Sequence, residues 1–382
     1  MNQTTFEPAP STSQFASLRK EVRDFLEETL GKHYPAAEQA RSWTGLDTGF
    51  SRKLGARGWL GMTLPRKYGG HQRTALERYV VVEELLAAGA PVAAHWIADR
   101  QSAPLLLHYG TEQQRIDILP RIAAGECYFC IGMSEPNSGS DLAAATTRAE
   151  TIDSGYLVNG TKLWTTNGHA AHYMTLFCRT SKAEDRRGGM SQLLVDMTTP
   201  GISVNPIIDL AGEHHFNDVR FDNVVLPSTA LLGQEGDGWK QVMGELAFER
   251  SGPERFLSSF ALLAELIRVV SAAPDRHSRR AVGRLLSHLM VLRHMSRSVA
   301  GMLERGENPS LQATIVKDLG AVLEQEIPEI ARSVAPVEAE QGSTAPYAST
   351  FARTLLAAPS FSLRGGTREI LRGIIARSLD LR

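Results

Sequence analysis

Cysteine is scarce in this chain, and long apolar runs are missing from it. Three cysteines among 382 residues are typical of a protein from a reducing compartment, so we expect a cytoplasmic location. No apolar run approaches the roughly 18–20 residues that a membrane-spanning helix needs. The polar, proline-containing stretch from Met1 to Ser13 also lacks the basic start and apolar core of a secretory signal. The sequence therefore predicts neither secretion nor a membrane anchor.

An excess of charge of either sign is also lacking. Charged residues make up 22% of the chain and the formal net charge is −1, so neither a nucleic-acid-binding surface nor an acidic tail is indicated. At 382 residues the chain is long enough for a large core and for more than one domain. We therefore expect no nucleic acid and no membrane among its partners, and the function has to be sought in its motifs.

Two short cysteine and histidine motifs do not have the pattern of a metal site. Cys127-x-x-Cys130 lies inside an apolar stretch, and no second pair of ligands follows it. His214 and His215 are adjacent, so in a strand they would point to opposite faces, and no carboxylate accompanies them at a ligand spacing. We expect this histidine pair in a loop, and we expect no metal.

Periodicity divides the chain into three regions. Apolar residues recur at helical spacing in the first region, beginning with Phe15 and Leu18. Strand signals dominate the second region, and helical periodicity returns in the third. The sequence thus predicts an α+β fold with an N-terminal all-α domain (1–125), a middle β domain (126–235) and a C-terminal α-helical domain (236–382).

The most informative stretch runs from residue 127 to residue 168. An apolar strand, Cys127 to Met133, leads into SEPNSGSD at 134–141, whose small residues allow backbone amides to crowd a negatively charged group. The segment from Gly155 to Gly160 predicts a hairpin whose turn is Asn-Gly. Residues 162–166 then form a further strand that carries an aromatic residue beside two hydroxyls.

This stretch resembles the middle domain of the acyl-CoA dehydrogenase family, in which TEPGAGSD is followed by WIT. The segments GWLGMTLPRKYGG, LLLHYGTEQQRIDILPRIAAGE and GEHHFNDVRFDNVVLP are similar to other parts of the family, so the resemblance covers almost the whole chain. It implies an FAD-dependent α,β-dehydrogenation of an acyl-CoA to the trans-2-enoyl-CoA, with electron-transfer flavoprotein as the electron acceptor. That chemistry needs a carboxylate base, a rigidly held flavin and hydrogen-bond donors on the thioester oxygen.

The resemblance also implies particular cofactor and substrate contacts. Ser134 would contact the isoalloxazine edge, Trp164 would stack on the ring and Thr166 would lie near N5. On its residues alone, Trp164 could instead be a buried strand aromatic, and Thr367 and Glu369 could simply cap the last helix. The full set of implied cofactor contacts is Ile131, Met133, Ser134, Gly139, Ser140, Trp164, Thr165, Thr166, Thr367 and Glu369. The implied substrate contacts are Ser140, Arg250, Gly366 and Arg377.

The most informative comparison with the family concerns the position of the proton-abstracting base. Many members place a glutamate just before Gly-Thr in the C-terminal motif, but here that motif reads SLRGGTREI, with Gly365 at the glutamate's position. A second group takes its base from the helix after the β domain, where this chain has Phe-Glu249-Arg250. We therefore predict Glu249 as the base, although a Glu-Arg pair could equally mark a solvated helix face. The backbone N–H of Gly365 would still donate to the thioester oxygen.

A local feature distinguishes the surroundings of Glu249. Pro253 has no amide hydrogen to donate to the carbonyl of Glu249, four residues earlier. This predicts a kink in the helical run beside the candidate base.

The chain departs from the family pattern in its last third. Two family segments that reach the flavin of a neighbouring subunit, Arg-x-x-Phe-Gly and Gln-x-x-Gly-Gly, are not matched by residues 281–286 and 340–343. Arg364 and Arg368 are also unusual at their positions. These departures fit a bacterial branch that acts on bulky acyl-CoAs, in which some enzymes are hetero-oligomers of two related chains.

The resemblance therefore leaves a homo- or hetero-oligomer, dimeric or tetrameric, open. It also leaves two other functions open. One is a non-catalytic partner subunit of a hetero-oligomeric acyl-CoA dehydrogenase. The other is a flavin-dependent oxidase or monooxygenase on the same fold.

Overall fold

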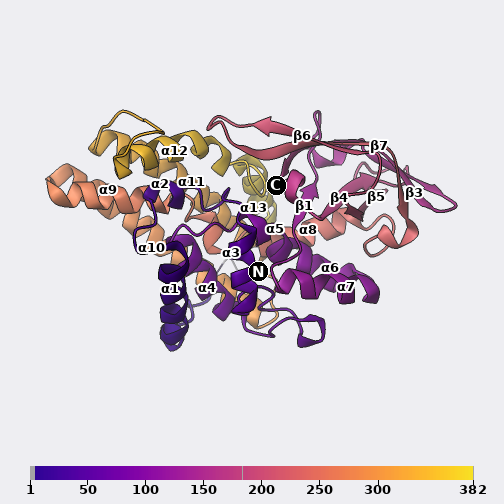
Figure 1. The fold of residues 1–382 in the computed structure, drawn as a ribbon, viewed down its shortest axis with the longest axis horizontal. Coiled ribbons are helices and arrows are strands. Elements are labelled where there is room, and N and C mark those ends of the chain that lie inside the picture. Colours follow the sequence, from indigo (N-terminus) through magenta and orange to yellow (C-terminus); the bar gives the residue numbers. More distant parts are fainter. Residues whose placement is uncertain (1–4, 183, 382) are drawn as a thin grey trace. The chain divides into compact units, whose positions relative to one another are not determined.

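The chain consists of helices and one β-sheet, which confirms the predicted α+β class (Figure 1). The computed structural model describes residues 5–182 and 184–381, and for residues 245–249 it describes the backbone only. The chain divides into two compact units. Unit 1 comprises Met1–Gly45, Arg73–Val92 and Leu246–Arg382, and unit 2 comprises Leu46–Gln72 and Ala93–Glu245. The three-domain division stays a prediction.

Unit 1 is helical in its described residues. Its first long helix confirms the predicted apolar stripe, because Leu18, Val22 and Phe25 are all buried on one face. The two longest helices, α10 and α11, pack against each other. The helices of this unit are α1 (Ala16–Leu30), α2 (Ala36–Gln39), α4 (Ala75–Ala87), α9 (Phe260–Ala272), α10 (Arg276–Glu304), α11 (Ser310–Val334), α12 (Pro346–Phe361) and α13 (Arg368–Ser378).

Side chains that accept hydrogen bonds from the first free amides fix several helix starts. Thr74 and Thr111 each form a capping box, before α4 and α7 respectively. Thr367 accepts from the amide of Ile370 at the start of α13, which confirms its predicted capping role.

Buried charges join three helices within unit 1. Glu83 and Glu84 on α4 are 7% and 6% exposed, so each needs a cation close by. The carboxylate of Glu83 accepts two hydrogen bonds from Arg293 of α10, at 2.6 and 2.9 Å, and Arg19 of α1 contacts both glutamates. Burial alone would raise the pKa of Glu83, but the hydrogen bonds and charges of the two arginines outweigh it and lower that pKa.

Unit 2 combines short helices with the whole sheet. Its helices are α3 (Thr48–Ala56), α5 (Ala93–Ile97), a π-helical turn (Ala98–Ser102), α6 (Ala103–Tyr109) and α7 (Glu112–Ala123), and α8 (Gly238–Glu249) crosses from this unit into unit 1. The strands are β1 (Phe129–Gly132), β2 (Arg148–Ile152), β3 (Gly155–Thr166), β4 (Tyr173–Arg179), β5 (Met190–Asp196), β6 (Ile202–Ile208) and β7 (His214–Pro227).

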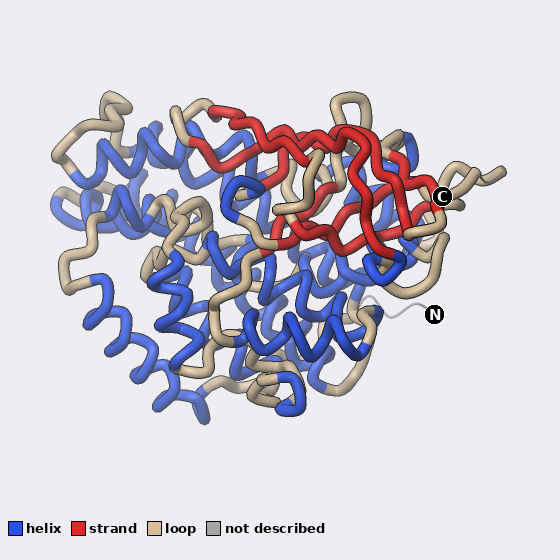
Figure 2. Tube along the Cα trace, turned by 45° about the vertical axis from the view of Figure 1, so that its right-hand side comes forward, coloured by secondary structure: helices blue, strands red, loops and turns tan. Residues whose placement is uncertain are grey.

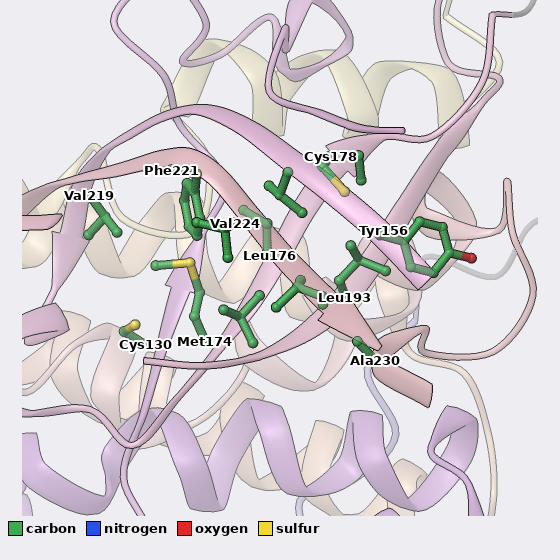
Figure 3. Packing of buried hydrophobic residues seen from close by; sticks show 14 residues of the cluster. Cys130, Tyr156, Met174, Leu176, Cys178, Leu193, Val219, Phe221, Val224 and Ala230 are labelled. Carbon is green, nitrogen blue, oxygen red and sulfur yellow. The ribbon is translucent and has the colours of Figure 1, made fainter. Parts of the chain in front are cut away.

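The strands form one seven-stranded sheet, drawn in red in Figure 2. Its order is β1-β4-β2-β3-β7-β6, with β5 paired to β4. β4 runs parallel to β1 and β2, whereas the pairs β2–β3, β3–β7, β4–β5 and β6–β7 are antiparallel. Fully buried side chains such as Val219, Leu176 and Leu193 form the core of this sheet (Figure 3).

The three cysteines are free and buried. Burial raises the pKa of Cys127 to about 11 and that of Cys178 to about 12. Cys130 is a member of the sheet core and is fully buried. At neutral pH these thiols are protonated, so they behave as small apolar side chains.

The predicted hairpin turn at Asn159-Gly160 is wrong. β3 runs without a break from Gly155 to Thr166, and the turn that joins it to β2 lies at residues 153–154. Gly160 serves a close approach instead, because a Cβ atom there would lie 2.5 Å from the hydroxyl oxygen of Thr147. The residue that suggested a turn is thus needed for strand packing.

Two further expectations are corrected. The helical run does not bend beside Glu249 but stops there, and the chain continues as a short 3₁₀ turn, Pro253–Arg255. The missing amide of Pro253 therefore coincides with a helix end rather than a kink. His214 and His215 lie in strand β7 rather than in a loop.

Among the described residues, no helix combines the length and the apolar character that crossing a bilayer requires.

Candidate active site

The loop that follows β1 is closed by its own backbone. Glu135 and Ser138 exchange two backbone hydrogen bonds, of 2.8 and 3.1 Å, and the hydroxyl of Ser138 donates to the carbonyl of Asp141 at 2.8 Å. Gly139 and Ser140 are exposed at the tip of this loop. The SEPNSGSD segment is therefore a tight, ordered turn that presents small residues to solvent.

A buried ion pair connects this loop to β3. The ammonium group of Lys162 lies 2.8 Å from a carboxylate oxygen of Glu135 and donates to the carbonyl of Met133 at 3.0 Å. The side chains of Lys162 and Glu135 are 0% and 4% exposed. The carboxylate of Glu135 also accepts hydrogen bonds from the amides of Thr146 and Thr147. A buried charge needs such additional hydrogen bonds to offset its loss of water.

The aromatic residue of the predicted flavin contacts is presented by a β-bulge. Lys162 pairs with Val219 and Thr165 with Asn217, so β3 holds one more residue than β7 between these two pairs. Trp164 lies in this bulge with a left-handed φ of 60°, and it is 54% exposed. A large aromatic side chain held outward at a strained backbone position is typical of a binding site.

The loop and the bulge are adjacent. The amide of Leu163 donates to the carbonyl of Ser134 at 2.8 Å, which brings the hydroxyl-bearing Ser134 beside the residue that precedes Trp164. Ile131 and Met133 lie on or directly after β1, half-buried, and Thr166 ends β3, also half-buried. Unit 2 therefore brings together the predicted contacts from Ile131 to Ser140 with those from Trp164 to Thr166.

A histidine pair supports the bulge from β7 and from the turn after β3. The buried amide nitrogen of Asn217 donates to the carbonyl of Thr165 at 2.9 Å. Its oxygen must then accept from His214 Nε2 at 2.8 Å and His169 Nδ1 at 3.3 Å, which fixes the tautomer of both rings. The two rings stack at 4.1 Å. Burial and the neighbouring His214 lower the pKa of His169, which favours its neutral form.

Replacing Asn217 with leucine is expected to lower the free energy of unfolding by about 1–3 kcal/mol, because the buried carbonyl of Thr165 loses its donor. Urea unfolding measures this change. The matched control is Asn159→Leu, which removes two exposed hydrogen bonds with Asn223 and is expected to change stability by no more than about 0.5 kcal/mol. Equal effects of the two substitutions would contradict the supporting role of Asn217.

The remaining predicted residues lie in unit 1. Gly365 and Gly366 form a turn before α13 with left-handed φ values of 67° and 98°. Thr367 caps α13, Glu369 lies in its first turn and Arg377 is exposed in its last turn. Unit 1 thus brings together the contacts predicted for the C-terminal motif, with Arg377 two to three turns further along the helix.

The candidate base lies at the end of α8. Glu249 is the last residue of that helix, and its side chain lies outside the described part of the chain. The next residue, Arg250, is 3% exposed, and its Nε donates to the carbonyl of Gly365 at 3.2 Å. Its Nη1 also contacts the hydroxyl of Thr314, at 3.4 Å. The backbone at the end of α8 is therefore connected directly to the turn that lacks a carboxylate.

Several residues that hold these segments were not predicted from the sequence. They are the Glu135–Lys162 pair, the Asn217 network, and the partners of Arg364 and Arg368. One signal was available on β3, where a lysine occupies an inward position and a tryptophan an outward one, the reverse of an ordinary half-buried strand. The partners in the other cases are distant in sequence, and no pattern in the residues connects them.

Family models match nearly the whole chain. Residues 12–126 match the acyl-CoA dehydrogenase N-terminal domain, residues 130–224 the middle domain and residues 236–379 the C-terminal domain. The acyl-CoA dehydrogenase IpdE1 of Mycobacterium tuberculosis is 31% identical over 379 residues, which cover 94% of this chain and 95% of that protein. The acyl-CoA dehydrogenase FadE26 of the same organism is 30% identical over 95% of this chain and 96% of its own length.

Solved structures agree with these matches. The chain superimposes on a structure titled "Tcur3481-Tcur3483 steroid ACAD" with a TM-score of 0.85 and 25% identity, covering 97% of this chain and 98% of that one. It superimposes on a chain of the ChsE4-ChsE5 complex from Mycobacterium tuberculosis with a TM-score of 0.84, 28% identity and 98% coverage of both chains. The fold and the matched sequence define a flavin-dependent class of oxidoreductases. The chain belongs to the acyl-CoA dehydrogenase family.

Proposed function

We propose that this chain catalyses the FAD-dependent α,β-dehydrogenation of an acyl-CoA thioester to the trans-2-enoyl-CoA, with Glu249 as the base. The observation that carries this proposal is the contact between Arg250 and Gly365. It links the end of α8, where Glu249 lies, to the turn at which other members of the family carry a glutamate. Because Gly365 has no side chain that could accept a proton, Glu249 is the carboxylate that remains.

The described residues of unit 2 fit a flavin. Trp164 presents a large ring that is more than half exposed, as stacking on another flat ring requires. Ser134 accepts from the amide of Leu163 through its backbone carbonyl, and Thr166 is the last residue of β3, so both hydroxyl-bearing residues lie close to Trp164 in the chain or through this bond. Thr165 and Gly139, with Ile131, Met133 and Ser140, are the other FAD contacts proposed for unit 2. Thr367 and Glu369, in unit 1, are each proposed as FAD contacts as well.

Each proposed residue has a separate role in the reaction. When bound, FAD supplies the acceptor for the β-hydrogen, which leaves the substrate as a hydride. The carboxylate of Glu249 takes the α-hydrogen as a proton. The N–H of Gly365 donates to the thioester oxygen and stabilises the negative charge that develops there. The proposed substrate contacts are Ser140, Arg250, Gly366 and Arg377.

An anaerobic titration tests this function. The protein is expressed alone, its visible spectrum is recorded, and a panel of linear, branched and steroid-derived acyl-CoAs is added. A yellow protein whose flavin is bleached by one of these compounds supports the proposal and identifies the substrate class. A yellow protein that no member of the panel bleaches would argue against it.

A hetero-oligomeric assembly is the second candidate. Two structures that the chain resembles at 25% and 28% identity carry two chain names in their titles, and one of them is called a steroid enzyme. We therefore propose a bulky acyl-CoA as the substrate class and a related chain as a partner. In this case the protein expressed alone would be colourless and would gain flavin on co-expression with that chain. We propose electron-transfer flavoprotein as the electron acceptor in both cases.

Replacing Trp164 with alanine is expected to weaken FAD binding by about 1–3 kcal/mol, the range that loss of a stacking aromatic produces at other π-stacked sites. The matched variant Trp164→Phe keeps a flat ring and should retain most of the affinity. Equilibrium titration of the apoprotein with FAD, followed by flavin fluorescence, gives both dissociation constants. If alanine and phenylalanine bound FAD as tightly as tryptophan, the ring would have no stacking role.

A further inference from the structure

The turn before α13 is intrinsically flexible. Gly365 and Gly366 follow each other, both with left-handed φ values, and glycine loses more conformational freedom on ordering than any other residue. A backbone N–H stabilises a developing charge well only when it is held in place before the reaction. Contacts on both sides of these two glycines provide such support.

Arg364 anchors the turn on its N-terminal side. Its guanidinium group lies 4.8 Å from the ring centres of both Trp43 and Phe361. It donates to the hydroxyl of Ser258 at 2.9 Å and to the carboxylate of Glu324 on α11 at 3.4 Å. Glu324 is fully buried, so its charge has a strong preference for a nearby cation. Arg364 is thus part of the interior of unit 1, with a side chain only 17% exposed.

Arg368 anchors the turn on its C-terminal side. Its Nε donates at 2.8 Å to the carboxylate of Asp318 on α11, and Asp318 is 8% exposed. Between these two anchors, Arg250 donates to the carbonyl of Gly365, and one Nη of Arg250 lies 3.4 Å from where a Cβ of Gly366 would be. Contacts therefore hold the turn at both of its ends and also in its middle, at the carbonyl of Gly365.

A single face of α11 provides most of this support. Residues of this helix contact the chain from the end of α12 to the start of α13 through ion pairs, through hydrogen bonds to backbone carbonyls and through the side chain of Arg250. These residues of α11 are Thr314, Lys317, Asp318, Glu324 and Gln325.

We propose that Arg364 and Arg368 are positioning residues that fix the Gly365–Gly366 turn to α11 and so hold the N–H of Gly365 as a ready donor to the thioester oxygen. This inference rests on the proposed function. It gives a physical reason for the two arginines that depart from the family pattern. The alternative is that both ion pairs only pack α13 against α11, in which case their loss would lower stability without a specific effect on the turn.

Hydrogen exchange of the full chain without ligand, combined with kinetics, separates the two cases. The variants are Arg364→Met and Arg368→Met, which keep the apolar stem and remove the charge, and Asp318→Asn as a milder test of the second anchor. The matched control is Arg284→Met, which removes another ion pair to α11, with Glu326 at 2.8 Å. Exchange is followed in peptides that cover residues 362–368, and melting temperatures are measured alongside.

We expect the anchor variants to exchange these amides roughly tenfold faster than the wild type, because local opening of the turn becomes easier. The control should exchange them at the wild-type rate. We also expect kcat to fall about tenfold or more with KM within a few-fold, since loss of a donor to the oxyanion acts mainly in the transition state. If Arg364→Met and Arg368→Met exchange these amides at the wild-type rate, the two arginines do not anchor the turn. If the exchange is faster but kcat is unchanged, anchoring the turn does not position the N–H donor for catalysis.

The exchange measurement also keeps this inference separate from the proposed function. If no acyl-CoA reduces the flavin of the wild type, the dehydrogenase assignment fails and the donor role falls with it. The exchange rates of the unliganded variants still decide whether the two arginines order the glycine turn.

Discussion

The Glu249→Gln variant is expected to reduce its flavin with acyl-CoA at least about 100-fold more slowly than the wild type, because a positioned general base contributes roughly 10²–10⁴-fold. Glutamine has nearly the same size as glutamate but cannot accept the α-proton at neutral pH. Flavin binding should persist, since none of the proposed FAD contacts is changed. Anaerobic stopped-flow bleaching measures the rate, and the visible spectrum measures the bound flavin.

A large decrease in the reduction rate is expected because the turn that Arg250 contacts has no carboxylate of its own. α8 ends at this residue, and the following arginine bonds to the carbonyl of Gly365. A turn with two glycines offers backbone donors but no carboxylate. If Glu249 loses its proton-accepting group, neither glycine of the turn can replace it.

Two comparisons make this test specific. Glu329→Gln removes a carboxylate from an exposed pair with Arg332 on α11 and should react at the wild-type rate. Exchange of the substrate's α-hydrogen with solvent deuterium should occur in the wild type and be lost in Glu249→Gln, which isolates the proton transfer from the hydride transfer. A Glu249→Gln enzyme that turned over within a few-fold of the wild type would sink the assignment of the base.

Replacing Lys162 with methionine is expected to lower the free energy of unfolding by about 3–5 kcal/mol, because removal of one partner leaves a buried charge uncompensated. Methionine fills a similar volume, so the effect reports the charge rather than a cavity. Glu135 would keep its hydrogen bonds to the amides of Thr146 and Thr147 but lose its cation. Urea unfolding of the two proteins at neutral pH gives the difference.

A double variant and a surface pair serve as controls for Lys162. Glu135→Gln combined with Lys162→Met removes both charges and should recover a large part of the lost stability. Arg186→Met breaks the exposed pair with Asp141, whose side chains are 67% and 59% exposed, and should change stability by at most about 1 kcal/mol. An equal, small effect of Lys162→Met and Arg186→Met would contradict the importance of the buried pair.

The same pair makes the stability of the protein depend on pH. Burial alone would raise the pKa of Glu135, but the charge and hydrogen bond of Lys162 outweigh it and lower that pKa from 4.5 to about 2. A folded-state pKa below the unfolded value stabilises the fold above pH 4.5. This contribution is lost as the pH falls from 4.5 through about 2. The urea midpoint of the wild type should therefore decrease across this window more steeply than that of the double variant.

Local signals in the sequence predicted much of the architecture. The apolar stripe of α1, the threonine cap of α13 and the apolar run that contains β1 all depend on residues close to each other in the chain. Such patterns determine whether a segment is helix or strand, and each of these elements is present in the structure. The order of helical, strand-rich and helical regions followed from them.

Predictions failed where tertiary contacts decide the local structure. Asn159-Gly160 has the composition of a hairpin turn, but the approach of Thr147 makes that glycine part of a strand. Helical periodicity after residue 238 gave no sign of the breaks between α9, α10 and α11. Propensity describes a segment in isolation, and packing partners override it.

The candidate site was predicted as a set of residue types rather than as an arrangement. The motifs indicated Trp164 and Gly365, but not the bulge that turns Trp164 outward or the two acidic residues of α11 that fix the arginines beside Gly365. Lys162 shows the reason. Its partner is 27 residues away, and a strand lysine considered alone is expected at the surface.

The composition of unit 1 has a consequence for how the protein is made. Its residues come from both ends of the chain, with Met1–Gly45 joined by Leu246–Arg382. Translation proceeds at about 5–20 residues per second, so α4 leaves the ribosome many seconds before α10, with which it is in contact, has been made. Until then, Glu83 of α4 lacks its ion-pair partner Arg293. A nascent chain that has produced unit 2 can therefore fold its sheet early, while unit 1 has to wait until the last helix is released.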